Sequence, residues 1–73
     1  MIKVLFFGYI ADQMGRRSLC LEGNQSLADV MKAVGCDASM PLLLAVNQEQ
    51  VRDVDMIIQN GDEVAIMPPF SGG

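Results

Sequence analysis

The amino-acid sequence predicts an α+β fold, in which one main helix covers one face of a β-sheet. Segments rich in β-branched and aromatic residues lie near both ends of the chain, at residues 2–9 and 63–67. Between them, residues 27–34 carry one apolar stripe at helical spacing. Pairs of turn-forming residues separate the remaining short segments, as expected for a sheet built from several strands.

The first predicted element is a strand that starts at Ile2 and ends near Gly8 or Ile10. A single helical turn over residues 11–15 follows, closed by its final glycine. Residues 17–22 then alternate between apolar and polar side chains, which is typical of a strand with one buried face. We therefore expect the two strands to form an N-terminal hairpin with an elaborated loop.

The clearest predicted helix starts after Ser26 and stops at Gly35. Serine is a good N-terminal cap, and Asp29 stands where a capping box has its acidic residue, although Glu or Gln is preferred there. The apolar stripe consists of Leu27, Val30, Met31 and Val34. Glycine after the last apolar residue is a common helix stop, so both ends of this helix are predicted.

The second half of the chain is expected to contain short strands and turns. In chain order we predict a connection at residues 36–41, a buried strand at 42–46, a short strand at 50–52, an unassigned segment at 53–58 and a last strand at 63–67. Turns are predicted at Asn47-Gln48 and Asn60-Gly61, since asparagine and glycine tolerate positive φ. Pro68 ends the last strand.

Alternation along the first and last strands predicts an apolar surface on the side of the sheet away from the helix. Leu5 and Phe7 point to that side on the first strand, and Met67 does so on the last. A solvated sheet face is normally polar. An apolar patch rimmed by charges such as Lys3 and Glu63 therefore predicts a protein interface. The alternative is that loops cover these side chains.

The composition argues against several classes of function. A net charge of −4 disfavours nucleic acid as a partner and fits a partner with a basic docking surface. No apolar run has the length of a membrane helix, so no membrane partner is expected. The chain lacks histidine, and Cys20 and Cys36 have no metal-site spacing. We expect a cytosolic carrier or binding module with reduced thiols, no metal and no bound cofactor, rather than a free-standing enzyme.

The last six residues are the most informative part of the sequence for function. They are Pro68, Pro69, Phe70, Ser71, Gly72 and Gly73, and we separate them as a tail from a domain at residues 1–67. Prolines favour extended backbone, and two glycines let a chain end enter a channel too narrow for side chains. The predicted reacting group is therefore the α-carboxyl of Gly73. The alternative is a frayed terminus or an artificial extension.

Three stretches of the chain resemble the small, sulfur-carrier subunit of molybdopterin synthase. They are MIKVLFF at residues 1–7, AVNQ at 45–48, and residues 60–73, where NGDEVA is followed by MPPFSGG. The double proline at the right distance from the GDEV strand is the most specific of these matches. The resemblance covers nearly the whole chain. It implies a ubiquitin-like β-grasp fold, with a mixed sheet and one main helix on one face.

The resemblance also implies a chemistry for Gly73. An ATP-dependent adenylating enzyme of the ubiquitin-activating type would activate the carboxylate, and a sulfur donor would then leave a thiocarboxylate. Residues 68–72 would insert the tail into the large subunit of molybdopterin synthase. There the sulfur would pass to a cyclic pyranopterin monophosphate precursor of the molybdenum cofactor. Leu5, Phe7 and Met67 would contact the partner, and the complex is expected to be a heterotetramer.

Two departures from the family pattern concern the partner contacts. Many members carry a longer, partly helical insert where this chain has only residues 36–41, and Met67 stands where an aromatic residue is common. Neither changes the tail. Two other functions stay open: a sulfur carrier for thiamine thiazole synthesis, against which the pair Pro68-Pro69 argues, and a protein modifier conjugated through Gly73.

Overall fold

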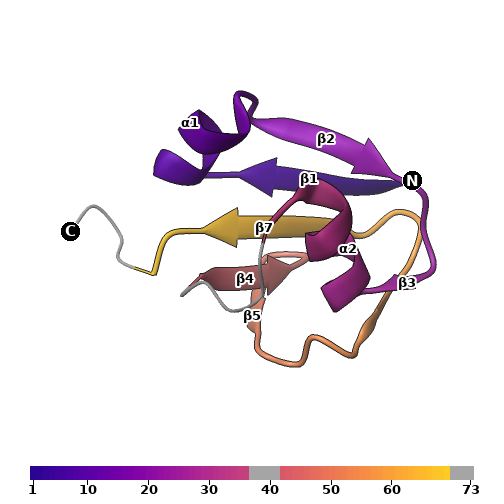
Figure 1. Ribbon diagram of the computed structural model, residues 1–73. Coiled ribbons are helices and arrows are strands. Elements are labelled where there is room, and N and C mark those ends of the chain that lie inside the picture. Colours follow the sequence, from indigo (N-terminus) through magenta and orange to yellow (C-terminus); the bar gives the residue numbers. More distant parts are fainter. Residues whose placement is uncertain (37–41, 70–73) are drawn as a thin grey trace.

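The computed structural model describes residues 1–36 and 42–69, and shows a five-stranded sheet with a second, two-stranded sheet beside it (Figure 1). In chain order the elements are β1 (Ile2–Phe6), α1 (Tyr9–Met14), β2 (Ser18–Leu21), β3 (Gln25–Ser26), α2 (Leu27–Val34), β4 (Leu43–Val46), β5 (Glu49–Val51), β6 (Ile57–Ile58) and β7 (Glu63–Met67). The predicted α+β class is confirmed. Of the predicted connection at 36–41, only Cys36 belongs to the described residues.

The large sheet has the first and last strands of the chain side by side at its centre (Figure 1). Its order is β2-β1-β7-β4-β5. β7 runs parallel to β1, with Lys3 opposite Glu63 and Phe6 opposite Ile66, and antiparallel to β4. The pairs β1–β2 and β4–β5 are antiparallel, so the predicted N-terminal hairpin is confirmed and the sheet is mixed.

β1 is shorter than the sequence indicated, and the predicted strand end near Gly8 or Ile10 is wrong. The strand ends at Phe6, although Phe7 still donates its N–H to the carbonyl of Ile66 on β7 at 3.1 Å. Gly8 then turns the chain with a φ of 57°, in the left-handed region that favours glycine. The residues that follow form α1 instead of extending the strand, and Ile10 turns into the core.

Both helices stop where the sequence predicts, although α1 begins at Tyr9 and not at residue 11. α1 stops at Gly15, which has a left-handed φ of 72°. At the start of α2 the hydroxyl of Ser26 accepts the backbone N–H of Asp29 at 3.1 Å, which satisfies one donor of the first turn. The helix stops at Gly35, with a φ of 84°. These stops and the Ser26 cap are set by residues close to one another in the chain.

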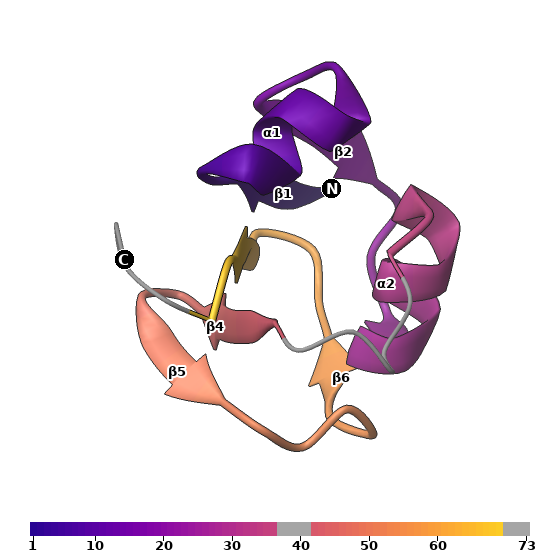
Figure 2. The ribbon, with the colours of Figure 1, turned by 60° about the vertical axis from the view of Figure 1, so that its left-hand side comes forward.

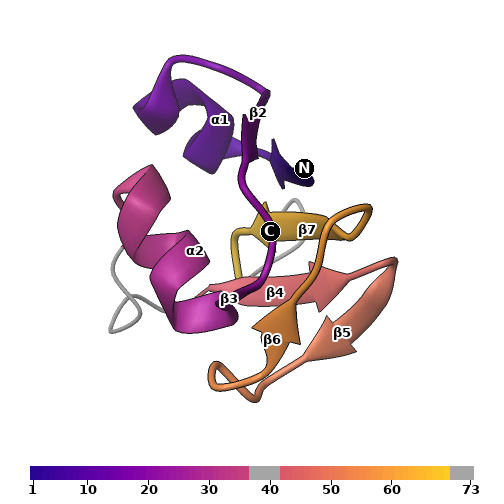
Figure 3. The same ribbon diagram turned by 90° about the vertical axis from the view of Figure 1, so that its right-hand side faces the viewer.

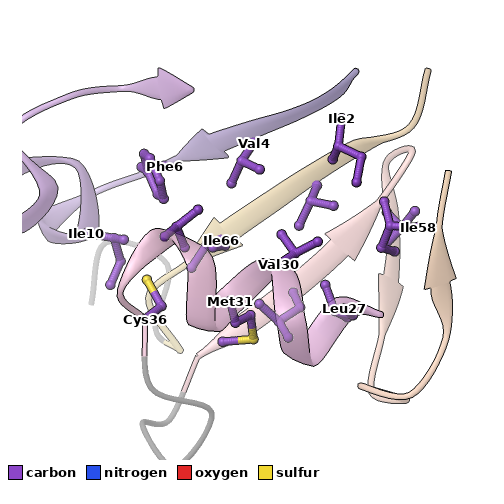
Figure 4. Close-up of a cluster of buried hydrophobic side chains, with 14 residues drawn as sticks. Ile2, Val4, Phe6, Ile10, Leu27, Val30, Met31, Cys36, Ile58 and Ile66 are labelled. Carbon is purple, nitrogen blue, oxygen red and sulfur yellow. The ribbon is translucent and has the colours of Figure 1, made fainter. Parts of the chain in front are cut away.

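The core lies between the large sheet and the two helices, which Figure 3 shows together on one side of it. Among the described residues the buried cluster comprises Ile2, Val4, Phe6, Ile10, Leu27, Val30, Met31, Val34, Cys36, Leu44, Val46, Ile58, Val64 and Ile66 (Figure 4). The residues of β1 and β7 that alternate with the predicted apolar surface all belong to it, namely Ile2, Val4, Phe6, Val64 and Ile66. The predicted stripe of α2 is also entirely buried.

The segment at residues 53–58, which the sequence left unassigned, packs against the start of α2 (Figure 2). Part of it forms β6, which pairs with β3. The carbonyls of Val54 and Met56 accept the N–H groups of Ala28 and Leu27, both at 2.9 Å. These donors belong to the first turn of a helix, where no acceptor within the helix is available. The segment thus completes the N-terminal cap of α2.

The two predicted turns are confirmed by their backbone angles. Asn47 and Gln48 have φ of 52° and 71° between β4 and β5, as a two-residue hairpin with a primed turn requires. Gly61 has a φ of 93° before β7. Both turns lie at the start of β7, at the opposite end of that strand from the tail.

Side-chain hydrogen bonds tie these two turns together. The side chain of Asn47 donates from Nδ2 to Asp62 Oδ1 at 3.1 Å, and its Oδ1 accepts the N–H of Glu63 at 3.0 Å. Asp62 Oδ2 accepts the N–H of Gln59 at 2.8 Å. We call Asn47 and Asp62 the turn latch. The pKa of the Asp62 carboxyl is held below its usual range, mainly by the hydrogen bond from the Gln59 N–H and to a lesser extent by that from the Asn47 amide.

The turn latch predicts a loss of stability in acid. Because the pKa of Asp62 is lower in the folded chain than in the unfolded one, its contribution is present above the unfolded pKa and disappears as the pH falls through the folded value. Asp62→Asn should therefore flatten the fall in unfolding free energy between about pH 7 and about pH 3. Urea unfolding at several pH values across that range measures the unfolding free energy of both chains.

The matched control for this prediction is Asp55→Asn, the same chemical change at an exposed carboxyl in the segment between β5 and β6. It should leave the acid dependence close to that of the unaltered chain. Equal acid dependence in the Asp62→Asn variant and the unaltered chain would show that the latch contributes no pH-dependent stability.

Candidate functional site

The base of the tail lies against the loop between β1 and α1. Pro68 and Pro69 follow β7 and are both half-buried. A Cβ atom added to Gly8 would lie only 2.8 Å from Cγ of Pro68, so the proline ring packs directly on the glycine backbone. A side chain at that position would push against the ring. The β1–α1 loop therefore fixes where the tail leaves the domain.

The other predicted tail residues, Phe70, Ser71, Gly72 and Gly73, lie outside the described residues. Pro68 and Pro69 are the part of the predicted tail that the structure describes. The assignment of the reacting group to the carboxyl of Gly73 stays a prediction, as does the division of the chain at residue 67.

The sheet face opposite the helices carries the three predicted contact residues. Leu5 lies opposite Ala65 of β7, and Met67 lies opposite Leu43 of β4. None of these four belongs to the core cluster of the described chain. Leu5 and Met67 are half-buried, while Phe7, just after β1, keeps 45% of its surface exposed. We call this surface the open face.

The open face changes in chemistry along the strands. Its far end has a polar row, in which Lys3 lies between Cys20 and Glu63. The next row has Leu5 beside two small residues, Ala65 and its partner Ala45 on β4. The row nearest the tail has the larger apolar side chains of Met67, Leu43 and, by its place after β1, Phe7. Apolar surface thus increases toward the tail base.

Sequence reasoning missed the contribution of β4 to the open face. Leu43 and Ala45 face the same side as Met67 and Ala65, because their partners on β7 are those residues. The signal was present, since residues 42–46 are apolar at every position and a strand that buries one face needs only alternate ones. The same argument had identified Leu5 and Phe7 on the first strand.

A groove of about 470 Å³ opens beside the tail base. Among its lining residues are Leu5 and Phe7 from β1 and its end, and Ala11, Asp12 and Arg17 around α1. Gly8, which touches Pro68, forms part of the same lining. We call it the tail-base groove. No sequence pattern predicted this groove, because it arises from the way α1 folds back on the end of β1.

The two cysteines occupy different environments. Cys20 is exposed on β2, and Cys36 is buried after α2, where burial raises the pKa of its thiol. Both are free thiols. Within residues 1–36 and 42–69, no three His, Cys, Asp or Glu side chains are grouped as metal ligands would be. None of the helices in the described part of the chain has the length and apolar character to cross a membrane.

The sequence is similar to those of known proteins along nearly its whole length. The family model described as the ThiS family matches residues 4–73. The molybdopterin synthase sulfur carrier subunit of Dictyostelium discoideum is 36% identical, with 97% of this chain and 94% of the relative covered. The subunit of the same name from Homo sapiens is 32% identical, over 99% of this chain and 93% of the relative. The subunit of the same name from Chlamydomonas reinhardtii is 37% identical, over 99% of this chain and 98% of the relative.

The structure is similar to those of small ubiquitin-like proteins. It matches the small archaeal modifier protein 1 of Methanosarcina acetivorans with a TM-score of 0.79 at 22% identity, covering 99% of this chain and 95% of the other. For the Haloferax volcanii protein SAMP1 the TM-score is 0.77 at 20% identity, covering 99% and 98%. At these identities the likeness concerns the fold, and it confirms the ubiquitin-like β-grasp that the sequence resemblance implied.

The sequence matches extend over nearly the whole chain and nearly the whole of each relative. All three relatives exceed 30% identity and have the same name, molybdopterin synthase sulfur carrier subunit. The chain therefore belongs to the ThiS family, and within it is similar to the sulfur carrier subunits of molybdopterin synthase.

Proposed function

We propose that this chain is the sulfur-carrier subunit of a molybdopterin synthase and that the carboxyl of Gly73 carries the sulfur. The observation that supports the proposal best is the agreement of the curated relatives, which bear that name and align with the chain over almost its full length. The family match extends to residue 73, so it includes the predicted tail. The chain acts as a sulfur-donating subunit of a transferase complex and supplies no catalytic side chains of its own.

The chemistry needs activation of the carboxylate before sulfur can enter, because a carboxylate is a poor electrophile. An adenylating enzyme uses ATP, so that an oxygen of the Gly73 carboxylate attacks the α-phosphate and pyrophosphate leaves. A sulfur donor then displaces AMP, and the C-terminal carboxyl becomes a thiocarboxylate. The thiocarboxylate sulfur next attacks a carbon of a cyclic pyranopterin monophosphate, so that a C–S bond forms while a C–O bond at that carbon breaks and its oxygen leaves. Hydrolysis of the C–S bond to Gly73 returns the carboxylate and leaves the sulfur on the precursor.

The geometry of the tail base suits this use. Pro68 is held against Gly8, so the tail starts from a fixed point at the apolar end of the open face. Pro68, Pro69, Phe70, Ser71 and Gly72 would then place Gly73 inside the partner. Reaction requires the reacting atoms to approach to within about 3–3.5 Å, which a fixed starting point assists.

Leu5, Phe7 and Met67 provide the docking surface in this proposal. They form the apolar part of the open face nearest the tail, and a partner that takes up the tail must cover that region. The large subunit is the partner that we propose. A structure of similar fold from Helicobacter pylori 26695, with a TM-score of 0.71 at 18% identity, is a complex of subunits 1 and 2 of molybdopterin-converting factor. That complex supports an assembly of two kinds of subunit here. We expect this assembly to be a heterotetramer.

Two related functions use the same fold. The structural neighbours named small archaeal modifier proteins support a protein modifier, which would be joined through Gly73 to lysine on another protein. A carrier for thiamine thiazole synthesis is the second alternative, although the pair Pro68-Pro69 argues against it. The sequence relatives favour the molybdopterin synthase subunit over both.

Intact mass spectrometry of the protein purified from its own host tests the proposal. A thiocarboxylate replaces oxygen by sulfur at Gly73 and adds about 16 Da to the chain. Supply of the charged protein to the large subunit, with the pyranopterin precursor, should return the uncharged mass and form molybdopterin. A mass that never rises, together with Gly73 found in isopeptide linkage to lysine, would favour the modifier.

A further inference from the structure

The tail-base groove is continuous with both parts of the proposed docking site. Phe7 lines the groove and also belongs to the open face, while Gly8 lines the groove and touches Pro68. A protein that covers Phe7 and draws the tail past Gly8 therefore lies over the opening of the groove. The occupant that this continuity favours is a side chain of that same protein.

The lining of the groove defines the chemistry of its occupant. Leu5, Phe7 and Ala11 offer apolar surface, and a volume of about 470 Å³ gives room for an apolar side chain of another protein. The polar groups are the carboxylate of Asp12 and the guanidinium of Arg17, both on exposed residues. An apolar interior with a charged border is the usual anatomy of a protein interface.

The charge beside the tail-base groove differs from that of the rest of the chain. The chain has 5 Lys and Arg residues against 9 Asp and Glu, yet two of the five cations, Arg16 and Arg17, are consecutive here. A smaller hollow of about 320 Å³ next to the groove is lined by both arginines, with Asp12 as its acidic group. Arginine presents a planar fork of donors that pairs with carboxylates through two parallel hydrogen bonds. The surface around Arg16 and Arg17 is therefore suited to an acidic group on the partner.

We propose that the tail-base groove receives an apolar side chain of the protein that accepts the tail, and that Arg17 at its edge pairs with a carboxylate of that protein. The inference rests on the proposed function and makes it more specific. An acidic chain suggests a partner whose surface is basic overall. Opposite Arg17, however, the partner presents an acidic group beside an apolar one, which fixes the orientation in which the two proteins meet.

The test is a charge reversal with a matched control. Arg17→Glu and Arg52→Glu change the net charge equally, but Arg52 lies after β5, at the opposite edge of the large sheet from β2. Binding to the large subunit from the same organism is measured for both at low and at high salt. Arg17→Glu should weaken binding about tenfold at low salt and less at high salt, because the ions screen an exposed pair. Arg52→Glu should change binding far less.

A second variant tests the groove itself. Ala11→Leu places a larger apolar side chain in the groove from α1 and should weaken binding at every salt concentration, since the partner side chain no longer fits. Thermal unfolding of each variant shows that it is folded before binding is compared. If Ala11→Leu lowers the melting temperature enough to unfold the chain, the test depends on Arg17→Glu alone. That variant should stay folded, because the side chain of Arg17 is exposed.

The outcomes separate this inference from the proposed function. Equal weakening by Arg17→Glu and Arg52→Glu would mean that only total charge matters, and it would overturn the inference while the carrier function stands. Unchanged binding by folded Ala11→Leu would likewise overturn the role of the groove. If the unaltered chain does not bind the large subunit, both the proposed function and the inference fail.

Discussion

A chain that lacks Gly73 should lose sulfur transfer completely while its unfolding transition stays almost unchanged. In the proposed function the carboxyl of Gly73 is the reacting group, and a chain one residue shorter presents it several ångströms from its target, far outside the 3–3.5 Å or so that reaction needs. The core cluster of the described chain ends at Ile66, so the deletion removes none of it. Molybdopterin formation with the large subunit, and thermal unfolding of the free chain, measure the two effects.

The controls for this prediction add a residue instead of removing one. One alanine appended after Gly73 should abolish transfer as the deletion does, because the glycine carboxyl is no longer terminal. One alanine placed before Met1 should leave transfer intact, since Met1 is 65% exposed at the other end of the chain. Full transfer by the chain without Gly73 would refute the carrier function.

Replacing two neighbouring phenylalanines should produce opposite results. Phe6 is 3% exposed in the core, whereas Phe7 is 45% exposed on the open face. Phe6→Ala should cost about 3–5 kcal/mol of unfolding free energy, as a buried phenylalanine usually does, and should affect binding only through unfolding. Phe7→Ala should cost much less stability. It should weaken binding to the large subunit and to the adenylating enzyme by about 2 kcal/mol, because interface energy concentrates in a few apolar anchors.

The two variants act as controls for each other. They delete the same side chain one position apart, so any difference between them comes from the face of the sheet on which the phenylalanine lies. Chemical denaturation and titration with each partner decide the matter. A Phe7→Ala chain that binds both partners as the unaltered chain does would remove Phe7 from the docking surface.

Elements with local signals could be predicted from the sequence. The cap at Ser26, the stops at Gly15 and Gly35 and the turn at Asn47 all depend on residues close in the chain, and the structure confirms each of them. The end of β1 was misplaced because Tyr9 favours strands, and only the left-handed turn at Gly8 moves it into α1.

Elements that depend on distant residues could not be predicted. β6 exists because residues 53–58 satisfy the first turn of α2 and pair with β3, both far away in the sequence. The groove residue Arg17 was missed for a different reason, because the groove exists only once α1 packs on the end of β1, and no sequence pattern indicates that packing. Leu5, Phe7 and Met67 were placed correctly on the open face because strand alternation needs no knowledge of the partner strand.

The parallel pairing of β1 with β7 has a consequence for how the protein is made. On the ribosome β1 is synthesised early and β7 late, yet Lys3 lies opposite Glu63 on the central ladder of the sheet. The contacts of highest sequence separation must therefore form near the end of synthesis, which makes folding slower than for a chain of local contacts. A nascent chain that stops before β7 lacks both the middle of its sheet and the tail that follows it. A truncated chain thus has no assembled docking surface, and it does not compete with the full-length protein for its partners.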